Sequence, residues 1–186
     1  MLVRHGETEW SRAHRHTSST DLPLTPLGER QAEALALVLA GRRFVAVLSS
    51  PRRRARDTAK RAGLTISAVD DDLAEWDYGD YEGVTTEEIH RDRPEWMLWT
   101  DGGPGGESPE QVEARIDRVV ARLTPLVTEG DVAVVGHGHA LRVLAARWIG
   151  LPVAAGRLLR LDTATLSTLG FEHASRVITL WNAPVG

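Results

Sequence analysis

Short runs of apolar residues alternate with longer segments of mixed apolar and polar residues along most of the chain. A short apolar run between turn residues is typical of a buried strand, and a longer segment between capping residues is typical of a helix. The predicted strands cover residues 1–4, 44–48, 64–69, 131–135, 158–161, 165–171 and 177–181. The predicted helices cover residues 25–40, 50–63, 108–126 and 139–149, with one more short helix beginning at residue 85.

Capping signals support three of the helix starts. Thr25 and Ser108 each precede a proline, which is the preferred order of an N-cap and a first helical residue. Thr85 and Glu88 have the spacing of a capping box, in which each side chain bonds the backbone N–H of the other residue. The segments between these elements are predicted loops: a polar one at residues 11–24, an acidic and aromatic one at 70–84, and a flexible Gly-rich one at 94–107.

The alternation of strands and helices favours a sheet that is covered by helices on both faces. We therefore expect an α/β fold, a three-layer α/β/α sandwich with a mostly parallel central sheet. The length of 186 residues fits one domain with a substantial core, and we expect that domain to span residues 1–186.

Composition and charge narrow the possible functions. The net charge of −4 and the isoelectric point of about 6.0 argue against a nucleic-acid or membrane-surface partner. The absence of cysteine excludes disulfides, cysteine nucleophiles and cysteine metal ligands. No apolar run approaches the roughly 18 residues of a membrane span, and no signal peptide precedes the first motif, so the cytoplasm is the expected location.

Two histidines follow directly on predicted strands. The first strand ends in Arg4-His5-Gly6, and the strand at 131–135 runs into Gly136-His137-Gly138 just before a helix. Ligands of α/β sheets bind at the carboxyl ends of the strands, so both motifs deliver their side chains to a candidate site. Each signal alone has a plainer interpretation: His5 as a core histidine beside a surface arginine, and His137 with His139 as a pair of metal ligands.

Two charged residues stand out for their positions. Arg54 lies one turn into a helix whose first turn holds three arginines, although the N-terminal end of a helix dipole disfavours cations. A sequence that breaks a local rule often does so at a functional site, and Arg54 is placed to face an anion held at the helix start. Glu75 lies between apolar and aromatic neighbours, and a partly desolvated carboxyl is suited to act as a general acid. Singly, the arginines also fit a solvated basic face and Glu75 a solvated acidic loop.

Together the four motifs resemble the histidine phosphatase superfamily, also called the phosphoglycerate-mutase-like family. The resemblance covers nearly the whole chain and follows the family order of motifs: Arg4-His5-Gly6, Ser50-Pro51 with Arg54, Glu75 ahead of Gly79 and Glu82-Gly83, and His137-Gly138. The tracts 70–83 and 137–142 are especially similar to a subgroup of acid phosphatases and sugar bisphosphatases.

The resemblance implies a phosphatase that hydrolyses small phosphate monoesters and needs no metal or other cofactor. His5 would attack phosphorus and become phosphohistidine, while Glu75 would protonate the leaving oxygen and then help to activate water. The residues implied to hold the substrate, with Arg4, Arg54 and His137 on the phosphoryl oxygens, are Arg4, Ser11, Thr17, Arg54, His137 and Gly138. Many members of the family have Asn at the position of Ser11, so the chain departs from the family pattern there.

Three other functions are less consistent with the sequence. Phosphoglycerate mutases of the family are longer and carry a proline-rich stretch where this chain has residues 96–103. A non-catalytic phosphoester-binding module on the same fold is disfavoured because His5 and Glu75 are both present. A metal-binding protein ranks last because it lacks carboxylates at suitable spacing; it would use His14, His16, His137 and His139.

The sequence leaves several roles open. Trp96 and Trp99 fit either a cover over the pocket or the core, and His139 fits either a substrate contact or a cap of its own helix. The physiological substrate and the oligomeric state do not follow from the sequence, because the leaving-group pocket is built from variable loops.

Overall fold

Six strands form one sheet in the order β3-β2-β4-β1-β5-β6. The computed structural model describes residues 1–185. Four strands are parallel neighbours: β1 (Leu2–Arg4), β2 (Ala46–Ser49), β3 (Ala68–Val69) and β4 (Val132–Gly136). The hairpin of β5 (Leu166–Glu172) and β6 (Ser175–Ala183) adds two antiparallel strands beside β1. The predicted α/β class with a mostly parallel sheet is confirmed.

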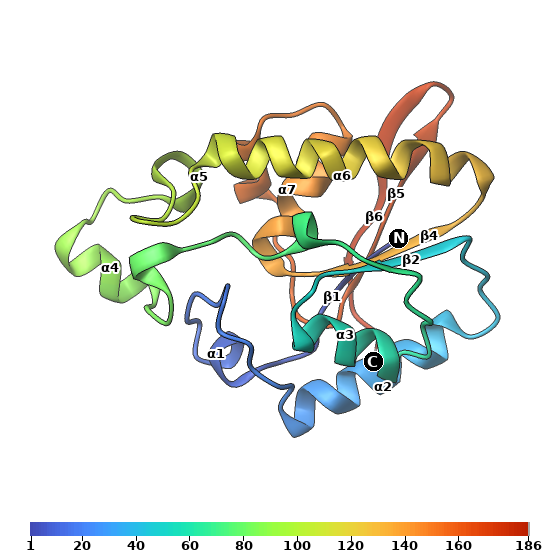
Figure 1. Cartoon of the computed structure of the whole chain (residues 1–186), viewed down its shortest axis with the longest axis horizontal. Coiled ribbons are helices and arrows are strands. Elements are labelled where there is room, and N and C mark those ends of the chain that lie inside the picture. Colours follow the sequence, from blue (N-terminus) through green and yellow to red (C-terminus); the bar gives the residue numbers. More distant parts are fainter. Residues whose placement is uncertain (186) are drawn as a thin grey trace.

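Helices cover both faces of this sheet, which gives the three expected layers (Figure 1). One face carries α6 (Pro109–Glu129) and α7 (Gly138–Trp148), and the other carries α2 (Pro26–Leu39) and α3 (Arg53–Arg61). The shorter helices lie toward the left of Figure 1: α1 (Glu9–Arg12), α4 (Thr86–Asp92) and α5 (Leu98–Asp101). Three 3₁₀ segments complete the chain: η1 (Asp71–Leu73), η2 (Gly79–Tyr81) and η3 (Val153–Leu158).

Two apolar cores lie on either side of the sheet. Every residue of β4 is buried, as expected for a central strand with helices on both faces. Helix α6 buries side chains at a spacing of three to four residues, which packs one stripe of the helix against the sheet and α7. The buried stripe consists of Val112, Ile116, Val119, Val120 and Leu123. The smaller core on the opposite face packs α2 and α3 against Val3 and Val135.

Several predicted elements were wrong. Residues 158–161 were predicted as a strand, but η3 ends at Leu158 and no strand follows before β5. Their place is decided by a long-range contact, because the carbonyl of Leu161 accepts a hydrogen bond from Arg4 Nη1 and holds this segment across the end of β1. The strand predicted at 64–69 shortens to the two residues of β3.

Two predicted loops contain helices. The loop at 11–24 begins inside α1, which Thr8 and Ser11 close with a reciprocal capping box. The segment 94–107 contains α5 and is not an open loop, because Trp96 is buried and its Nε1 donates to the carbonyl of Gly102 at 3.0 Å. Trp96 therefore belongs to the core.

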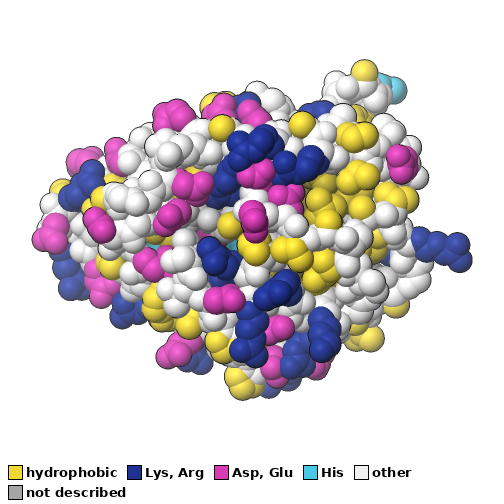
Figure 2. Space-filling view, in the orientation of Figure 1, with side chains coloured by type: hydrophobic (Ala, Val, Ile, Leu, Met, Phe, Trp, Pro, Cys, Tyr) yellow, Lys and Arg dark blue, Asp and Glu magenta, His cyan; other side chains and the backbone are white. Residues whose placement is uncertain are grey.

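The surface mixes both signs of charge. Figure 2 shows basic and acidic side chains interspersed over one face of the molecule. None of the helices between residues 1 and 185 combines the length and apolarity that a membrane span requires.

The turn after β1 depends on a close approach between two glycines. A Cβ atom on Gly6 would lie 2.4 Å from the carbonyl oxygen of Gly28, and one on Gly28 would lie 2.1 Å from that of Glu7. Real Cβ atoms do not come this close to backbone, so both positions require glycine. This contact seats the start of α2 directly against the chain that carries His5.

We expect Gly28→Ala to lower the free energy of unfolding by at least about 2 kcal/mol, measured by urea unfolding. Alanine gains roughly 1 kcal/mol in helix propensity, but its methyl group meets backbone that cannot move aside cheaply. Leu37→Ala on the same helix is the control, because Leu37 is 81% exposed and its loss should change stability by only about 0.5 kcal/mol. Equal stability of Gly28→Ala and wild type would show that the close approach is dispensable.

Candidate active site

The carboxyl ends of three parallel strands meet at one edge of the sheet. Arg4 of β1 is in register with Gly136 of β4, and Ser49 of β2 with Val135. The residues that follow these strand ends therefore become neighbours, and the rings of His5 and His137 lie 5.2 Å apart between centroids. The structure thus brings together two histidines that are 132 positions apart in the sequence.

His5 is held in one tautomer. Its side chain is buried, and Nδ1 lies 2.7 Å from the carbonyl oxygen of Gly6. A carbonyl only accepts, so Nδ1 carries the proton and the lone pair is left on Nε2. Burial, followed by the charges of Arg54 and Arg4, holds the pKa of His5 well below its usual 6.5. His5 is therefore a neutral imidazole at neutral pH, with a free lone pair on Nε2.

His137 is held in the other tautomer. Arg54 Nε donates to His137 Nδ1 at 3.1 Å, so the imidazole proton resides on Nε2, which lies 2.6 Å from Ser50 Oγ. Burial, with the charges of Arg54, His5 and Arg4, keeps the pKa of His137 well below 6.5. His137 is thereby fixed as a neutral donor behind His5.

Arg54 is fully buried, and most of its donors are already used. Besides Nε, its Nη1 donates to the carbonyl of Thr20 at 3.1 Å, and its Nη2 donates to those of Thr17 and Ser18 at 3.1 and 3.2 Å. Four of the five N–H groups of a guanidinium are therefore committed. Arg54 ties the loop at 17–20 to the two histidines, with one N–H left over.

Arg4 uses fewer of its N–H donors than Arg54 does. Its Nε is buried without a hydrogen-bond partner among the described residues, while Nη1 bonds the carbonyl of Leu161. A Cβ on Gly138 would come within 3.3 Å of Arg4 Cζ, so glycine at this position lets the guanidinium lie against the start of α7. A buried polar atom without a partner is costly, which marks Arg4 as a group awaiting an anion.

Glu75 is anchored at the N-terminus of α7. Its carboxyl accepts hydrogen bonds from three backbone N–H groups, those of Trp76, His139 and Ala140, at 2.8 to 3.0 Å. Only 7% of Glu75 is exposed, and the positive end of the helix dipole faces it. These contacts suit the ionised carboxylate, because backbone N–H groups can only donate.

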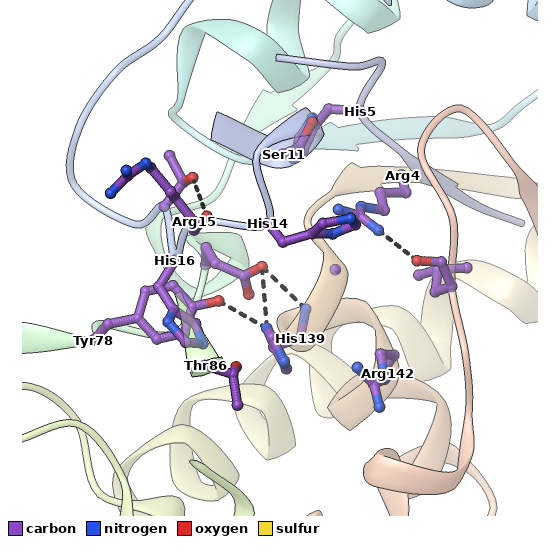
Figure 3. A pocket seen from close by; sticks show the side chains of 14 residues that line it. Arg4, His5, Ser11, His14, Arg15, His16, Tyr78, Thr86, His139 and Arg142 are labelled. Atoms are coloured by element: carbon purple, nitrogen blue, oxygen red, sulfur yellow. Dashed lines mark hydrogen bonds and ion pairs between the residues drawn. The ribbon is translucent and has the colours of Figure 1, made fainter. Parts of the chain in front are cut away.

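A cavity of about 260 Å³ opens onto these groups. Figure 3 shows Arg4, His5 and Ser11 on one side of it and Tyr78, His139 and Arg142 on the other. The predicted site residues that line it are Arg4, His5, Ser11, Thr17, Glu75 and Gly138. Arg54 and His137 are fully buried behind the lining.

Ser11 and Thr17 line the cavity with hydroxyls that already have partners. Ser11 Oγ donates to the carbonyl of Thr8 at 3.0 Å and accepts from the Thr8 N–H, which closes the cap of α1. Thr17 Oγ1 donates to the carbonyl of Arg15 at 3.0 Å. To contact the substrate as predicted, the two hydroxyls would have to exchange these hydrogen bonds or share them with the substrate.

Comparisons with known proteins agree with this geometry. The family model of the histidine phosphatase superfamily (branch 1) matches residues 1–184. An acid phosphatase of Mycobacterium tuberculosis is 45% identical over 97% of this chain and 90% of its own length. A sedoheptulose 1,7-bisphosphatase of Saccharomyces cerevisiae is 41% identical over 82% of this chain and 68% of its own.

A solved structure supports the same assignment. The protein of open reading frame Rv3214 from Mycobacterium tuberculosis superimposes with a TM-score of 0.96 at 44% identity, covering 100% of this chain and 97% of that one. The chain belongs to the histidine phosphatase superfamily.

The site of this histidine phosphatase includes Tyr78 and Arg142, which have no predicted role, and His139, whose role the sequence leaves open. The Tyr78 hydroxyl lies 2.8 Å from His139 Nδ1, and the Arg142 guanidinium stacks 4.6 Å from the centroid of Trp99. Tyr78, His139 and Arg142 all line the cavity, and the Trp99 ring packs against His139 with the ring centroids 5.2 Å apart. Tyr78 and His139 are 61 positions apart, and no local signal in the sequence pairs them.

The structure also bears on the metal-binding alternative. Within residues 1–185, no group of three or more His, Asp or Glu side chains is arranged to hold a metal ion. Both nitrogens of His137 are engaged, with Arg54 and with Ser50, so this histidine has no lone pair to offer a metal.

The buried histidines predict acid sensitivity. Burial and nearby arginines hold the pKa values of His5, His137 and His139 well below 6.5. As the pH falls below 6.5, the unfolded chain increasingly protonates these three histidines while the folded protein does not. Stability therefore falls as pH falls, with a slope that approaches about 1.4 kcal/mol per pH unit for each histidine.

We therefore expect the free energy of unfolding to drop on the order of 4 kcal/mol between pH 6.5 and 5.0, measured by urea unfolding. His139→Gln removes one of the three histidines, and its drop should be about a third smaller. A stability that does not change over this range would contradict the buried neutral histidines.

Proposed function

We propose that this protein hydrolyses small phosphate monoesters through a phosphohistidine intermediate on His5. The observation that carries the proposal is the neutral His5, whose Nε2 lone pair is free while Nδ1–H is held by Gly6. Nε2 attacks phosphorus, the P–N bond forms, and the P–O bond to the leaving group breaks. Water then attacks the phosphohistidine, which releases inorganic phosphate and restores the imidazole.

Positive groups surround the proposed position of the phosphoryl group. Arg4 offers an unused N–H from a buried Nε, and Arg54 adds its charge and one remaining N–H. His137 offers the Nε2–H that now bonds Ser50. Such preorganised donors stabilise the charge that develops on the phosphoryl oxygens, so a metal ion is not required in this mechanism.

Glu75 is the proposed proton donor and acceptor. It is the only acidic side chain among the residues that line the described cavity. As general acid, the Glu75 carboxyl would supply the proton that the leaving oxygen needs. After the leaving group departs, the carboxylate is ready to accept a proton from the attacking water.

The size and charge of the cavity support small anionic substrates. About 260 Å³ accommodates a phosphoryl group with a small leaving group, and arginines outnumber acids in its lining. The relatives named acid phosphatase and sedoheptulose 1,7-bisphosphatase support the same class of substrate. A metal-free mechanism and a cytoplasmic location are parts of this proposal.

We expect His5→Ala to lose turnover of p-nitrophenyl phosphate by at least about 1000-fold, assayed with EDTA present. The variant should also lose the acid-labile, base-stable label that phosphorylated substrate leaves on the wild type. His173→Ala, which changes an exposed histidine in the β5–β6 turn, should retain both. A label that persists in His5→Ala would identify another nucleophile, and wild-type activity that needs added magnesium or zinc would overturn the metal-free mechanism.

Glu75→Gln tests proton donation. General acid catalysis matters most for a poor leaving group, so we expect the variant to lose about 100- to 10,000-fold in kcat/KM on an alkyl phosphate. The loss on p-nitrophenyl phosphate should be at least about tenfold smaller. Asp77→Asn is the matched control, because Asp77 is exposed and outside the cavity. Equal losses on both substrates would mean that Glu75 positions or binds without donating the proton.

A further inference from the structure

The cavity extends beyond the groups that the proposed reaction uses. His5 and Arg4 lie on one side of it, and Tyr78, His139 and Arg142 form the opposite wall (Figure 3). Glu75 lines the cavity beside His139, whose backbone N–H donates to its carboxylate. A single phosphoryl group at His5 leaves the opposite wall without a partner. The side chains of this wall are therefore placed to contact the leaving group of the substrate.

Arg142 makes no ion pair on this wall, and the Glu75 carboxylate is the main opposite charge that acts on it. Its Nε donates to the carbonyl of Gly156 at 2.9 Å and its Nη2 to that of Arg157 at 3.0 Å, while its guanidinium stacks on Trp99. These contacts fix one edge and one face of the group and leave Nη1 unused. No carboxylate of the described chain lies within ion-pair distance of Arg142, in contrast to Arg15, which lies 3.8 Å from Glu88.

His139 presents a donor on the same wall. Tyr78 is buried, and burial raises the pKa of its hydroxyl, so this hydroxyl keeps its proton and donates to His139 Nδ1. The proton of the neutral imidazole then resides on Nε2, which has no hydrogen-bond partner in the described structure. His139 and Arg142 are three positions apart on α7 and lie on the same face of that helix.

We propose that Arg142 and His139 form a second anion subsite, which binds a phosphate or carboxylate group on the leaving group of the substrate. The preferred substrates are then phosphate monoesters that carry a second anionic group. This inference rests on the proposed function, because it takes the reacting phosphoryl group to lie at His5. The Arg142 guanidinium is held by two carbonyls and the His139 ring by the Tyr78 hydroxyl. Their remaining N–H groups can donate to the oxygens of either anion.

The same arrangement selects against neutral leaving groups. A neutral leaving group that fills this part of the cavity displaces water from Arg142 and supplies no charge to replace it. The subsite therefore acts in binding, and its loss should appear in KM more than in kcat.

The test compares wild type and Arg142→Gln on matched substrates. Fructose 1,6-bisphosphate is compared with fructose 6-phosphate, and 3-phosphoglycerate with glycerol 3-phosphate, so that the two pairs distinguish phosphate from carboxylate. We expect wild type to favour the anionic member of at least one pair by about tenfold or more in kcat/KM. Arg142→Gln should lose about 10- to 100-fold on that member, mainly through KM, and less than about threefold on its neutral partner.

Further variants separate charge from structure. Arg142→Lys keeps the charge and should keep part of the preference. His139→Gln keeps a side-chain N–H donor and should lose less than His139→Leu. Arg56→Gln removes one positive charge from an exposed position on α3 and should leave the preference unchanged. Thermal melting of every variant identifies any that is misfolded.

A binding measurement does not depend on turnover. Calorimetric titration of His5→Ala with fructose 1,6-bisphosphate and with 3-phosphoglycerate should show tighter binding than titration with the neutral partners, and adding Arg142→Gln should remove the difference. No preference in wild type, or equal losses on both members of a pair, would overturn the second subsite while leaving the phosphatase proposal intact. Failure to hydrolyse any of these phosphate monoesters, with the preference in binding preserved, would overturn the proposed function alone.

Discussion

Arg54 is fully buried near the carboxyl ends of the parallel strands, and none of its hydrogen bonds in the described chain goes to a carboxylate. Its charge is instead satisfied by three backbone carbonyls of the 17–20 loop and by the lone pair of His137 Nδ1. This constraint fixes the loop, fixes the tautomer of His137 and adds to the burial that keeps His5 neutral. The arrangement of the active site depends on this one side chain, and its buried positive charge favours an anion inside the cavity.

The charge balance of the site is completed from the opposite side by Glu75. Its carboxylate is held by three backbone N–H groups at the start of α7, and it faces the guanidiniums across the cavity. The start of α7 therefore helps to position three groups of the site. It follows His137, it bonds Glu75, and its glycine at position 138 makes room for Arg4.

Much of the fold could be predicted from local patterns. Strand β4 is a continuous apolar run, and α2 begins at Thr25-Pro26, where the side chain of Thr25 accepts from the N–H of Gly28. The wrong elements are those governed by distant contacts. Residues 158–161 look like a strand, yet the sheet position beside β1 is taken by β5, and the segment is drawn across the end of β1 by Arg4. Trp96 sits in a Gly-rich stretch that resembles a loop, but burial of its ring orders the segment.

The sequence by itself determined which residues end the central strands, and so it placed His5, Arg54 and His137 near one edge of an α/β sheet. That inference works because apolar runs and capping residues act locally and parallel strands end on the same side. Only the tertiary structure decided the tautomers of the two histidines and the bonds to Glu75. It also decided the pairing of Tyr78 with His139, which are 61 positions apart. These features depend on hydrogen-bond partners that the chain brings together only when it folds, and no periodicity in the sequence encodes such partners.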